Sequence, residues 1–249
     1  MQIPIFVINL DRSPDRLAAI AERLSELSLA FERVPAIDGA TLSERDARAA
    51  VSKRFWRHPP SRGEIGCYLS HIKALRAVLA SGAEQAIILE DDAAFTDEFR
   101  QVCSGGINPG VPFDILKLEG ANCNAPAIKP KGAAENVFYV VNSHGSAAYL
   151  ITREGTKKVL ERLPRLRYRY DDDLFCNWRN GLHIYDILPY SVRQRAHAST
   201  IQDRRAEPGY WLKLFRIVPK KIDKIRRDAF IYYRFGSAPP SAYKEKKGS

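Results

Sequence analysis

The sequence predicts an α/β fold in which helices flank a mainly parallel central sheet. Short apolar runs alternate along the chain with segments whose apolar residues recur at helical spacing, and this alternation favours parallel strands joined by helices. The apolar run at residues 86–89 would be buried on both faces, as in an inner strand of such a sheet. With 249 residues the chain is long enough for one large domain and a tail.

The first 58 residues are expected to contribute two strands and two helices. Residues 3–10 form the first strand candidate. A helix then begins at Ser13-Pro14, with serine as the cap and proline in the first turn. Residues 31–34 form a short strand that leads into a loop at residues 36–39. Residues 43–58 are polar and helix-prone.

A second long helix is expected to begin after Ser61, because Ser61 and Glu64 have the spacing of a capping box. The helix ends near residues 81–82, and the strand at residues 86–90 follows it. One face of the helix carries apolar residues at helical spacing, namely Ile65, Leu69, Ile72, Leu75 and Leu79.

The C-terminal half continues the alternation with shorter elements. Further strands are expected at residues 113–118, 138–141, 147–151 and 183–188, a loop at 121–136, and helices at 152–163 and from Asp171 onward. We therefore expect one domain over residues 1–203.

Residues 204–249 form a basic, aromatic-containing tail that holds most of the net charge. They contain thirteen Lys or Arg and four Asp or Glu, a net +9 within a whole-chain charge of +10. Cations mixed with aromatic and aliphatic residues suit a helix on an anionic bilayer surface. The alternative is that the aromatics pack on the body and the charges are solvated. Residues 237–249 are expected to be disordered. No nucleic-acid-binding motif accompanies the charge, so nucleic acid is not an expected partner.

The cysteines and the N-terminus favour a cytoplasmic protein. Cys67, Cys103, Cys123 and Cys176 show no C-x-x-C pairing and are expected to be reduced thiols, with disulfide bridges as the alternative that their even number allows. The N-terminal segment lacks a basic region and has only a short apolar stretch, so no signal peptide is expected. No run approaches the roughly 18 apolar residues of a membrane-spanning helix.

Three consecutive carboxylates, Glu90, Asp91 and Asp92, directly follow the apolar run at residues 86–89. Ligands of parallel sheets bind beyond the carboxyl ends of the strands, so we expect these side chains at the mouth of a site. Their mutual repulsion favours a positive partner, and a hard divalent cation that also holds a phosphate is the natural candidate. The alternative is a solvated acidic turn that caps the next helix.

Five blocks in order resemble glycosyltransferase family 25, which includes bacterial lipooligosaccharide and lipopolysaccharide β-galactosyltransferases. The resemblance covers roughly residues 3–202. Two small departures are Ala93, where the family often has valine, and Ser146-Ala147 in place of Thr-Ser. The blocks are residues 7–16 (VINLDRSPDR), Ala36-Ile37-Asp38-Gly39, Gly63-Glu64-Ile65-Gly66-Cys67 with Ser70-His71, Leu89-Glu90-Asp91-Asp92-Ala93, and residues 144–151 (HGSAAYLI).

The resemblance implies a GT-A-like fold, a UDP-sugar donor with UDP-galactose foremost, and Mn²⁺ or Mg²⁺ as cofactor. It also implies transfer with inversion to a hydroxyl of a lipopolysaccharide- or lipooligosaccharide-type glycan. By analogy, Glu90 and Asp92 stand at the outer positions of a metal-binding acidic signature, with Asp91 near the ribose or the metal waters. The cation would offset the charge that develops on the β-phosphate of the leaving group.

Inversion requires a general base on the face opposite the leaving group. Asp171, Asp172 and Asp173 are the first candidates, because the family carries acidic residues before this helix. Glu119 at another strand end is the second candidate, and His144 is the third. The alternative for the three aspartates is a favourable interaction with the helix dipole. For Glu119 and His144 the alternative is hydrogen bonding within loops.

Residues that follow the first strand are candidate contacts of the nucleotide, since this turn meets the nucleotide in many α/β folds. An arginine there can pair with the diphosphate. Asp38 could bind a ribose hydroxyl or the uracil N–H, or it could simply form an Asp-Gly turn. Ser70 and His71 lie in the capped helix, where His71 is either a ligand contact or a core histidine. Gln194 and Ser199 are expected to close the site. The candidates in the first turn are Asn9, Asp11, Arg12 and Arg16.

We therefore expect a metal-dependent hexosyltransferase, foremost a β-galactosyltransferase, that uses a UDP-sugar donor and a glycan or glycolipid acceptor. Its expected location is the inner face of the cell membrane, with residues 204–235 on the anionic lipid surface. One alternative is a metal-dependent phosphoester hydrolase, although the chain lacks a His-rich framework for two metals. The other is a non-catalytic relative that binds sugar nucleotide or membrane, although the acidic triplet is intact.

Overall fold

The computed structural model describes residues 2–52, 60–105, 107–120, 127–141, 143–194 and 217–236. Its strands are β1 (Ile5–Asn9), β2 (Glu32–Pro35), β3 (Gln85–Glu90), β4 (Ala93–Phe95), β5 (Ile115–Lys117), β6 (Ala127–Ile128), β7 (Val137–Val140), β8 (Ala148–Thr152), β9 (Ile184–Ile187) and β10 (Val192–Gln194). Its helices are α1 (Pro14–Glu26), α2 (Glu44–Ala50), α3 (Arg62–Ala80), α4 (Phe99–Cys103), α5 (Arg153–Arg162), α6 (Tyr170–Phe175), α7 (Asn177–Asn180) and α9 (Ile217–Phe235), with a 3₁₀ turn, η1 (Gly39–Thr41).

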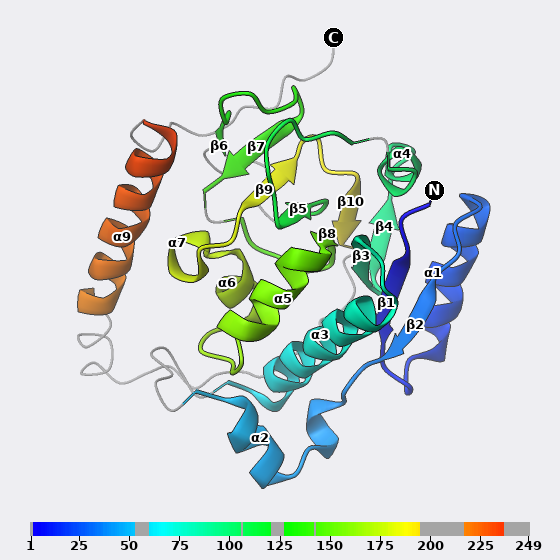
Figure 1. Cartoon of the computed structure of the whole chain (residues 1–249). Helices are drawn as coiled ribbons and strands as arrows, with labels where there is room; N and C mark the ends of the chain where they lie inside the picture. The colour runs from blue at the N-terminus through cyan, green and yellow to red at the C-terminus, as the bar shows by residue number, and fades with distance from the viewer. Residues whose placement is uncertain are drawn as a thin grey trace.

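A central eight-stranded sheet has the order β2-β1-β3-β8-β5-β9-β7-β6 (Figure 1). Six of these strands run in one direction, and β8 and β7 run against them. The expected α/β fold with a central sheet flanked by helices is confirmed, but the sheet is mixed rather than mainly parallel, because three of its seven strand pairings are parallel and four are antiparallel. The reversed strand β8 lies between β3 and β5, so its N-terminal end meets the carboxyl ends of both neighbours.

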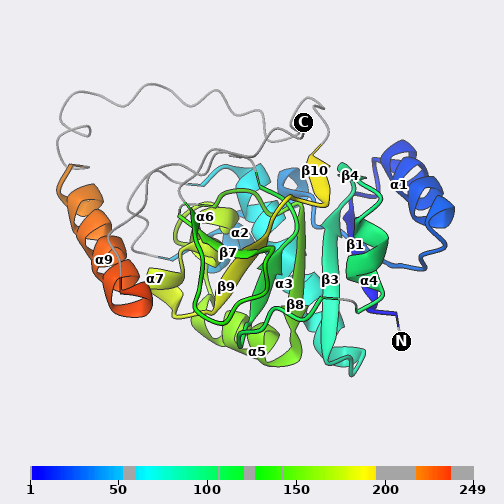
Figure 2. The ribbon, with the colours of Figure 1, turned by 90° about the horizontal axis from the view of Figure 1, so that it is seen from above.

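Two apolar cores cover the two faces of the sheet, because successive strand residues point to opposite sides. In β1, Ile5 and Val7 pack in the core that includes side chains of α1 and α4. Phe6 and Ile8 pack in the core that includes α3 and α5. The molecule is therefore a helix–sheet–helix sandwich, with α1 and α9 at opposite ends (Figure 2).

The two helix starts predicted from the sequence form by different means. Ser61 and Glu64 make both hydrogen bonds of the expected capping box at the start of α3. Helix α1 begins where expected, with Ser13 at the N-cap position and Pro14 in the first turn, but the Ser13 side chain makes no capping hydrogen bond. The side-chain amide of Asn9 donates to the Ser13 carbonyl instead, over 2.9 Å.

Several short elements were not predicted. Strands β4 and β10 form a separate antiparallel pair, which seats Gln194 opposite Ala93. Strand β6 lies within the expected loop at residues 121–136, and α4 and α7 are also additional. Elements of two to five residues carry too little periodic pattern to be recognised in a sequence.

Some expectations fall outside the described residues. These are the end of the helix predicted at residues 43–58, Ser199, Cys123 and the tail at 204–216 and 237–249. Cys67, Cys103 and Cys176 are free thiols, as expected. In the described part of the chain, no helix is long and apolar enough to cross a membrane. The domain boundary at residue 203 stays a prediction.

Candidate functional site

A cavity of about 500 Å³ opens at the carboxyl ends of β1 and β3. Its walls come from the loops after β1, β2 and β3, the first half of α3, the loop before β8 and the start of α6. Eleven residues predicted from the sequence line it, one of them, Gln194, from β10. The other ten are Asn9, Arg12, Arg16, Asp38, Ser70, His71, Glu90, Asp91, Asp92 and Asp171.

The acidic turn, Glu90–Asp92, is neutralised in part by Arg16 of α1. The Arg16 guanidinium contacts Asp91 and lies 3.3 Å from Asp92 Oδ2. The Asn9 amide donates to Asp91 Oδ2 over 2.8 Å, and Gln194 Nε2 donates to Asp92 Oδ2 over 3.0 Å. The positive partner that the sequence required is therefore supplied at least in part by the protein itself.

Burial raises the pKa values of Asp91 and Asp92, the two aspartates of this turn. It raises the pKa of Asp92 to about 6, with a further upward contribution from the Glu90 charge. Burial also raises the pKa of Asp91, and the hydrogen bond from Asn9 opposes that rise.

Asp92 Oδ1 is buried and has no hydrogen-bond partner among the described residues. A hard oxygen with nothing to bind fits a divalent cation.

Glu90 is held by two side chains that reach it from different elements. Ser146 Oγ donates to Glu90 Oε1 over 2.8 Å, and His71 Nε2 lies 3.3 Å from the same oxygen. The other ring nitrogen of His71 lies 3.1 Å from the Tyr149 hydroxyl. Burial alone would raise the pKa of Glu90, but the hydrogen bond and charge of His71 bring it below its ordinary value. His71 is a buried histidine that also lines the cavity, and its role as a ligand contact stays a prediction.

Asp38 and Arg12 form another part of the cavity wall. Arg12 Nε donates to Asp38 Oδ2 over 2.6 Å. This hydrogen bond holds the pKa of Asp38 below its ordinary value, helped by the Ala40 backbone N–H. Two glycines let this loop lie on α3. A Cβ on Gly66 would stand 2.6 Å from the Ile37 carbonyl oxygen, and one on Gly39 would stand 1.8 Å from the Arg62 carbonyl oxygen.

The three consecutive aspartates of α6 have different surroundings. Asp171 lines the cavity and accepts from the Gly145 backbone N–H over 3.2 Å. Asp172 Oδ1 lies 3.3 Å from His144 Nδ1, at a distance that allows an ion pair when His144 is protonated. Asp173 Oδ2 accepts from the backbone N–H groups of residues 167 and 168, so it closes the turn before α6.

Glu119 and Lys117 are buried behind the cavity wall, beneath the loop before β8. Lys117 Nζ donates to the His144 carbonyl over 2.9 Å. A Cβ on Gly145 would stand 2.5 Å from Glu119 Oε2, so the loop lies directly on this carboxyl. Burial raises the pKa of Glu119 to about 7, although the charge of Lys117 opposes the rise. Lys117 also lies near Asp186, whose carboxylate accepts from the Ser143 and Tyr190 hydroxyls.

Asp11 and His144 do not line the cavity. Asp11 is exposed and pairs with Arg33, and the side chain of His144 is about half exposed. Lys117 and Asp186 are not among the residues predicted from the sequence. A lysine inside the apolar run at residues 115–118 was the available signal, because an unpaired lysine is rarely buried.

Comparison with known proteins gives a match to the family model described as glycosyltransferase family 25 (LPS biosynthesis protein), over residues 2–174. One similar protein is a glycosyltransferase 25 family member of Aedes aegypti, 30% identical over 171 residues. Procollagen galactosyltransferase 2 of Homo sapiens is 26% identical over 174 residues. Inactive glycosyltransferase 25 family member 3 of Mus musculus is 26% identical over 171 residues.

Each of these three matches covers 64% of this chain and only 28% or 29% of the relative. The matched part of the chain therefore spans less than a third of the length of these relatives. Among solved structures, galactosyltransferase LgtC in complex with donor and acceptor sugar analogs is similar over 90% of this chain and 96% of that chain. The identity is 12% and the TM-score 0.42, a similarity too low to bear on function.

Proposed function

Since the chain belongs to glycosyltransferase family 25, we propose that it transfers a hexose, foremost galactose, from a UDP-sugar to a sugar hydroxyl, with inversion. The acceptor that we propose is a lipopolysaccharide- or lipooligosaccharide-type glycan. The observation that carries the proposal is one cavity in which the acidic turn, the arginines after β1 and a single aspartate of α6 meet.

The proposed cofactor is Mn²⁺ or Mg²⁺, held by Asp92 and Glu90. The buried, unpartnered Asp92 Oδ1 supports this choice. When bound, such a cation supplies electrostatic stabilisation of the diphosphate leaving group. Arg16 would keep Asp91 and Asp92 ionised and correctly placed, because its guanidinium lies against both carboxylates.

The proposed donor contacts lie on the rim formed by the loops after β1 and β2. Arg12 and Asp38 face each other there as an ion pair. In the complex Arg12 would bind a phosphate oxygen and Asp38 a hydroxyl or N–H of the nucleoside, each replacing part of their mutual bond. Asn9 would orient Asp91 through the amide hydrogen bond that it already makes.

Asp171 is the proposed general base. Among the five candidates for this role it alone lines the cavity, and Arg169 and the Gly145 N–H orient its carboxylate. It would accept the proton of the acceptor hydroxyl as that oxygen attacks the anomeric carbon. Asp172 and His144 form an adjacent pair that would position the same loop, and Asp173 is already committed to backbone hydrogen bonds.

We place the reaction at the inner face of the cell membrane, where a lipid-linked glycan acceptor would lie. The net charge of +9 in residues 204–249 supports contact with anionic lipid. A cytoplasmic, peripheral location follows from this proposal.

Incubation of the full chain with UDP-sugars, Mn²⁺ and candidate glycans tests the proposal. Release of UDP together with a new glycoside supports it, and cleavage of simple phosphoesters without sugar transfer would point to a hydrolase instead. Binding of UDP-sugar without turnover would indicate a non-catalytic protein, as the name of the mouse relative states for that protein.

Asp171→Asn should lower kcat by about 10²-fold or more, whereas Asp172→Asn should retain most activity.

A further inference from the structure

The outer side of α9 gathers the exposed large hydrophobic side chains of the molecule. In the described part of the chain these number four: Ile222, Ile225, Tyr232 and Tyr233, which are 46%, 68%, 62% and 87% exposed. Together with the exposed Ala229, these side chains recur every three or four residues along the helix. They therefore lie on one face of α9. We call this face the outer stripe.

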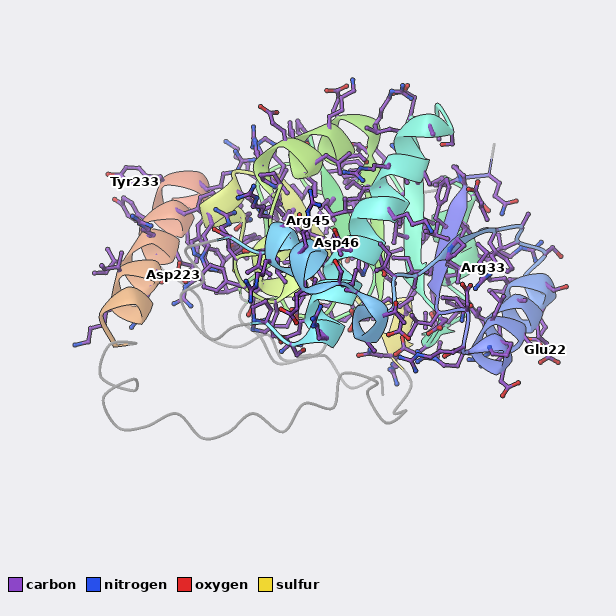
Figure 3. The ribbon with its side chains drawn as sticks, turned by 90° about the horizontal axis from the view of Figure 1, so that it is seen from below. Glu22, Arg33, Arg45, Asp46, Asp223 and Tyr233 are labelled. Atoms are coloured by element: carbon purple, nitrogen blue, oxygen red, sulfur yellow. The ribbon has the colours of Figure 1, made fainter. Side chains whose placement is uncertain are left out.

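The rotation of α9 about its axis is fixed by contacts of its inner side. Asp223 accepts hydrogen bonds from Arg179 Nε over 2.7 Å and from Trp178 Nε1 over 3.1 Å. Ile231 is fully buried in the core, and the Phe235 ring stacks on Tyr139 with centroids 4.8 Å apart. The outer stripe is therefore held away from the body, and Tyr233 extends from the outer side of the helix (Figure 3).

Two of the cations of α9 lie beside the outer stripe. The helix carries six Lys or Arg and two Asp. Both aspartates are half-buried and engaged, Asp223 with Arg179 and Asp228 with Arg227. Lys221 and Arg226 are exposed and, by helical geometry, border the outer stripe on its two sides. The side of α9 that faces away from the body is thus apolar along its centre, with one exposed cation on each edge, Lys221 and Arg226.

We propose that the outer stripe of α9 is the surface by which this protein docks on an anionic lipid bilayer. Isoleucine enters the boundary of the acyl chains, tyrosine rings occupy the headgroup level, and the bordering cations meet lipid phosphates. Charge complementarity selects this occupant over a second copy of the chain, since a second copy would bring the same cations into contact. The inference deepens the proposed function, because it names the surface next to which a lipid-linked acceptor would lie.

Sedimentation of the full chain with vesicles tests the proposal directly. The probes are vesicles of phosphatidylcholine alone and of phosphatidylcholine with phosphatidylglycerol, measured without donor or metal. We expect binding to the anionic vesicles only. Ile225→Ser/Tyr233→Ser should weaken it by about tenfold or more, through loss of the apolar contact.

A charge-matched pair of variants separates a specific docking face from general attraction of a basic protein. Lys221→Glu/Arg226→Glu reverses two charges beside the outer stripe and should reduce binding by about tenfold or more. Arg45→Glu/Arg48→Glu makes the same change on α2, where both arginines are exposed, and should stay within about twofold of wild type. Equal losses in the two variants, or no binding by the wild type, would overturn the proposal.

Two further readouts separate lipid docking from misfolding and from self-association. Circular dichroism checks that each variant is folded, and gel filtration checks for a dimer whose loss on Ile225→Ser/Tyr233→Ser would contradict a lipid-facing stripe. Transfer to a water-soluble acceptor is measured on the same samples. Failure of the proposed glycosyl transfer would appear in that assay alone, whereas vesicle binding judges the docking surface by itself.

Discussion

The three carboxylates of the acidic turn have different hydrogen-bond partners. We therefore expect them to have different roles. Glu90 is hydrogen-bonded by Ser146 and faces His71, and Asp91 is bonded by Asn9. Asp92 keeps one buried oxygen without a partner among the described residues. The carboxylate with an unused oxygen is the one best suited to bind an added cation.

Replacement of Asp92 by alanine is expected to abolish transfer while the fold is kept. Loss of a group that stabilises transition-state charge typically costs about 10²–10³ in kcat. Initial rates of UDP release, with circular dichroism on the same samples, measure the effect. Asp97→Ala is the matched control, because Asp97 is exposed and lies outside the cavity. Near-normal activity of Asp92→Ala would refute the metal-binding role.

Glu119 is expected to make stability fall as pH rises. Its pKa is raised to about 7 in the folded protein by burial, against an ordinary value near 4.5. Between these values the folded state retains a proton that the unfolded state has released, so stability is lost as pH rises through this window. The loss amounts to at most about 3 kcal/mol.

Glu119→Gln should remove this pH dependence, because glutamine does not titrate. Urea unfolding of wild type and variant at a series of pH values between about 4.5 and 8 gives the unfolding free energy of each protein as a function of pH. The plots of unfolding free energy against pH should diverge as pH rises, because the wild type loses stability that the variant keeps. Parallel curves would show that Glu119 titrates normally.

At the scale of single elements, α3 positions more of the cavity wall than any other described helix. Its capping box fixes where the helix begins, Gly66 allows the loop at residues 36–39 to lie on it, and Ser70 Oγ accepts the Ile37 backbone N–H over 2.8 Å. Asp38 and His71 therefore reach the same cavity from different elements.

Ser61→Ala should destabilise the protein by about 1 kcal/mol, because it removes the side-chain acceptor at the start of α3. Chemical denaturation measures the change in the unfolding free energy. Ser25→Ala is the control, since Ser25 is exposed inside α1, where alanine has the higher helix propensity. If both variants were equally stable, the capping box would contribute nothing measurable.

At the scale of the whole molecule, the reversed strand β8 adds one wall of the cavity. Because β8 runs against β3 and β5, the loop that precedes it lies at the carboxyl end of β3, where the Glu90 N–H donates to the Ala147 carbonyl over 2.8 Å. This arrangement brings Ser146 to Glu90 and the Gly145 N–H to Asp171. Parts of the chain far apart in sequence thus share one site.

Metal and nucleotide are expected to stabilise the protein cooperatively. UDP with Mn²⁺ at about 100 times the dissociation constant should add about 3 kcal/mol and raise Tm by several degrees. Thermal unfolding with UDP alone, Mn²⁺ alone and both ligands measures the coupling, and EDTA should reverse it. A UDP-dependent shift of the same size in EDTA would show that the metal does not help to hold the diphosphate.

The amino-acid sequence alone predicts the α/β class, the long helices α1 and α3, the inner strand β3 and about half of the residues that line the cavity. Those features depend on local spacing of apolar residues and on contiguous motifs, which are visible in one dimension. The tertiary structure decided which of three adjacent aspartates lines the cavity and that Arg16 pairs with the acidic turn. It also revealed that a buried lysine supports the loop before β8. Such contacts depend on strand order and direction, and long-range packing sets both.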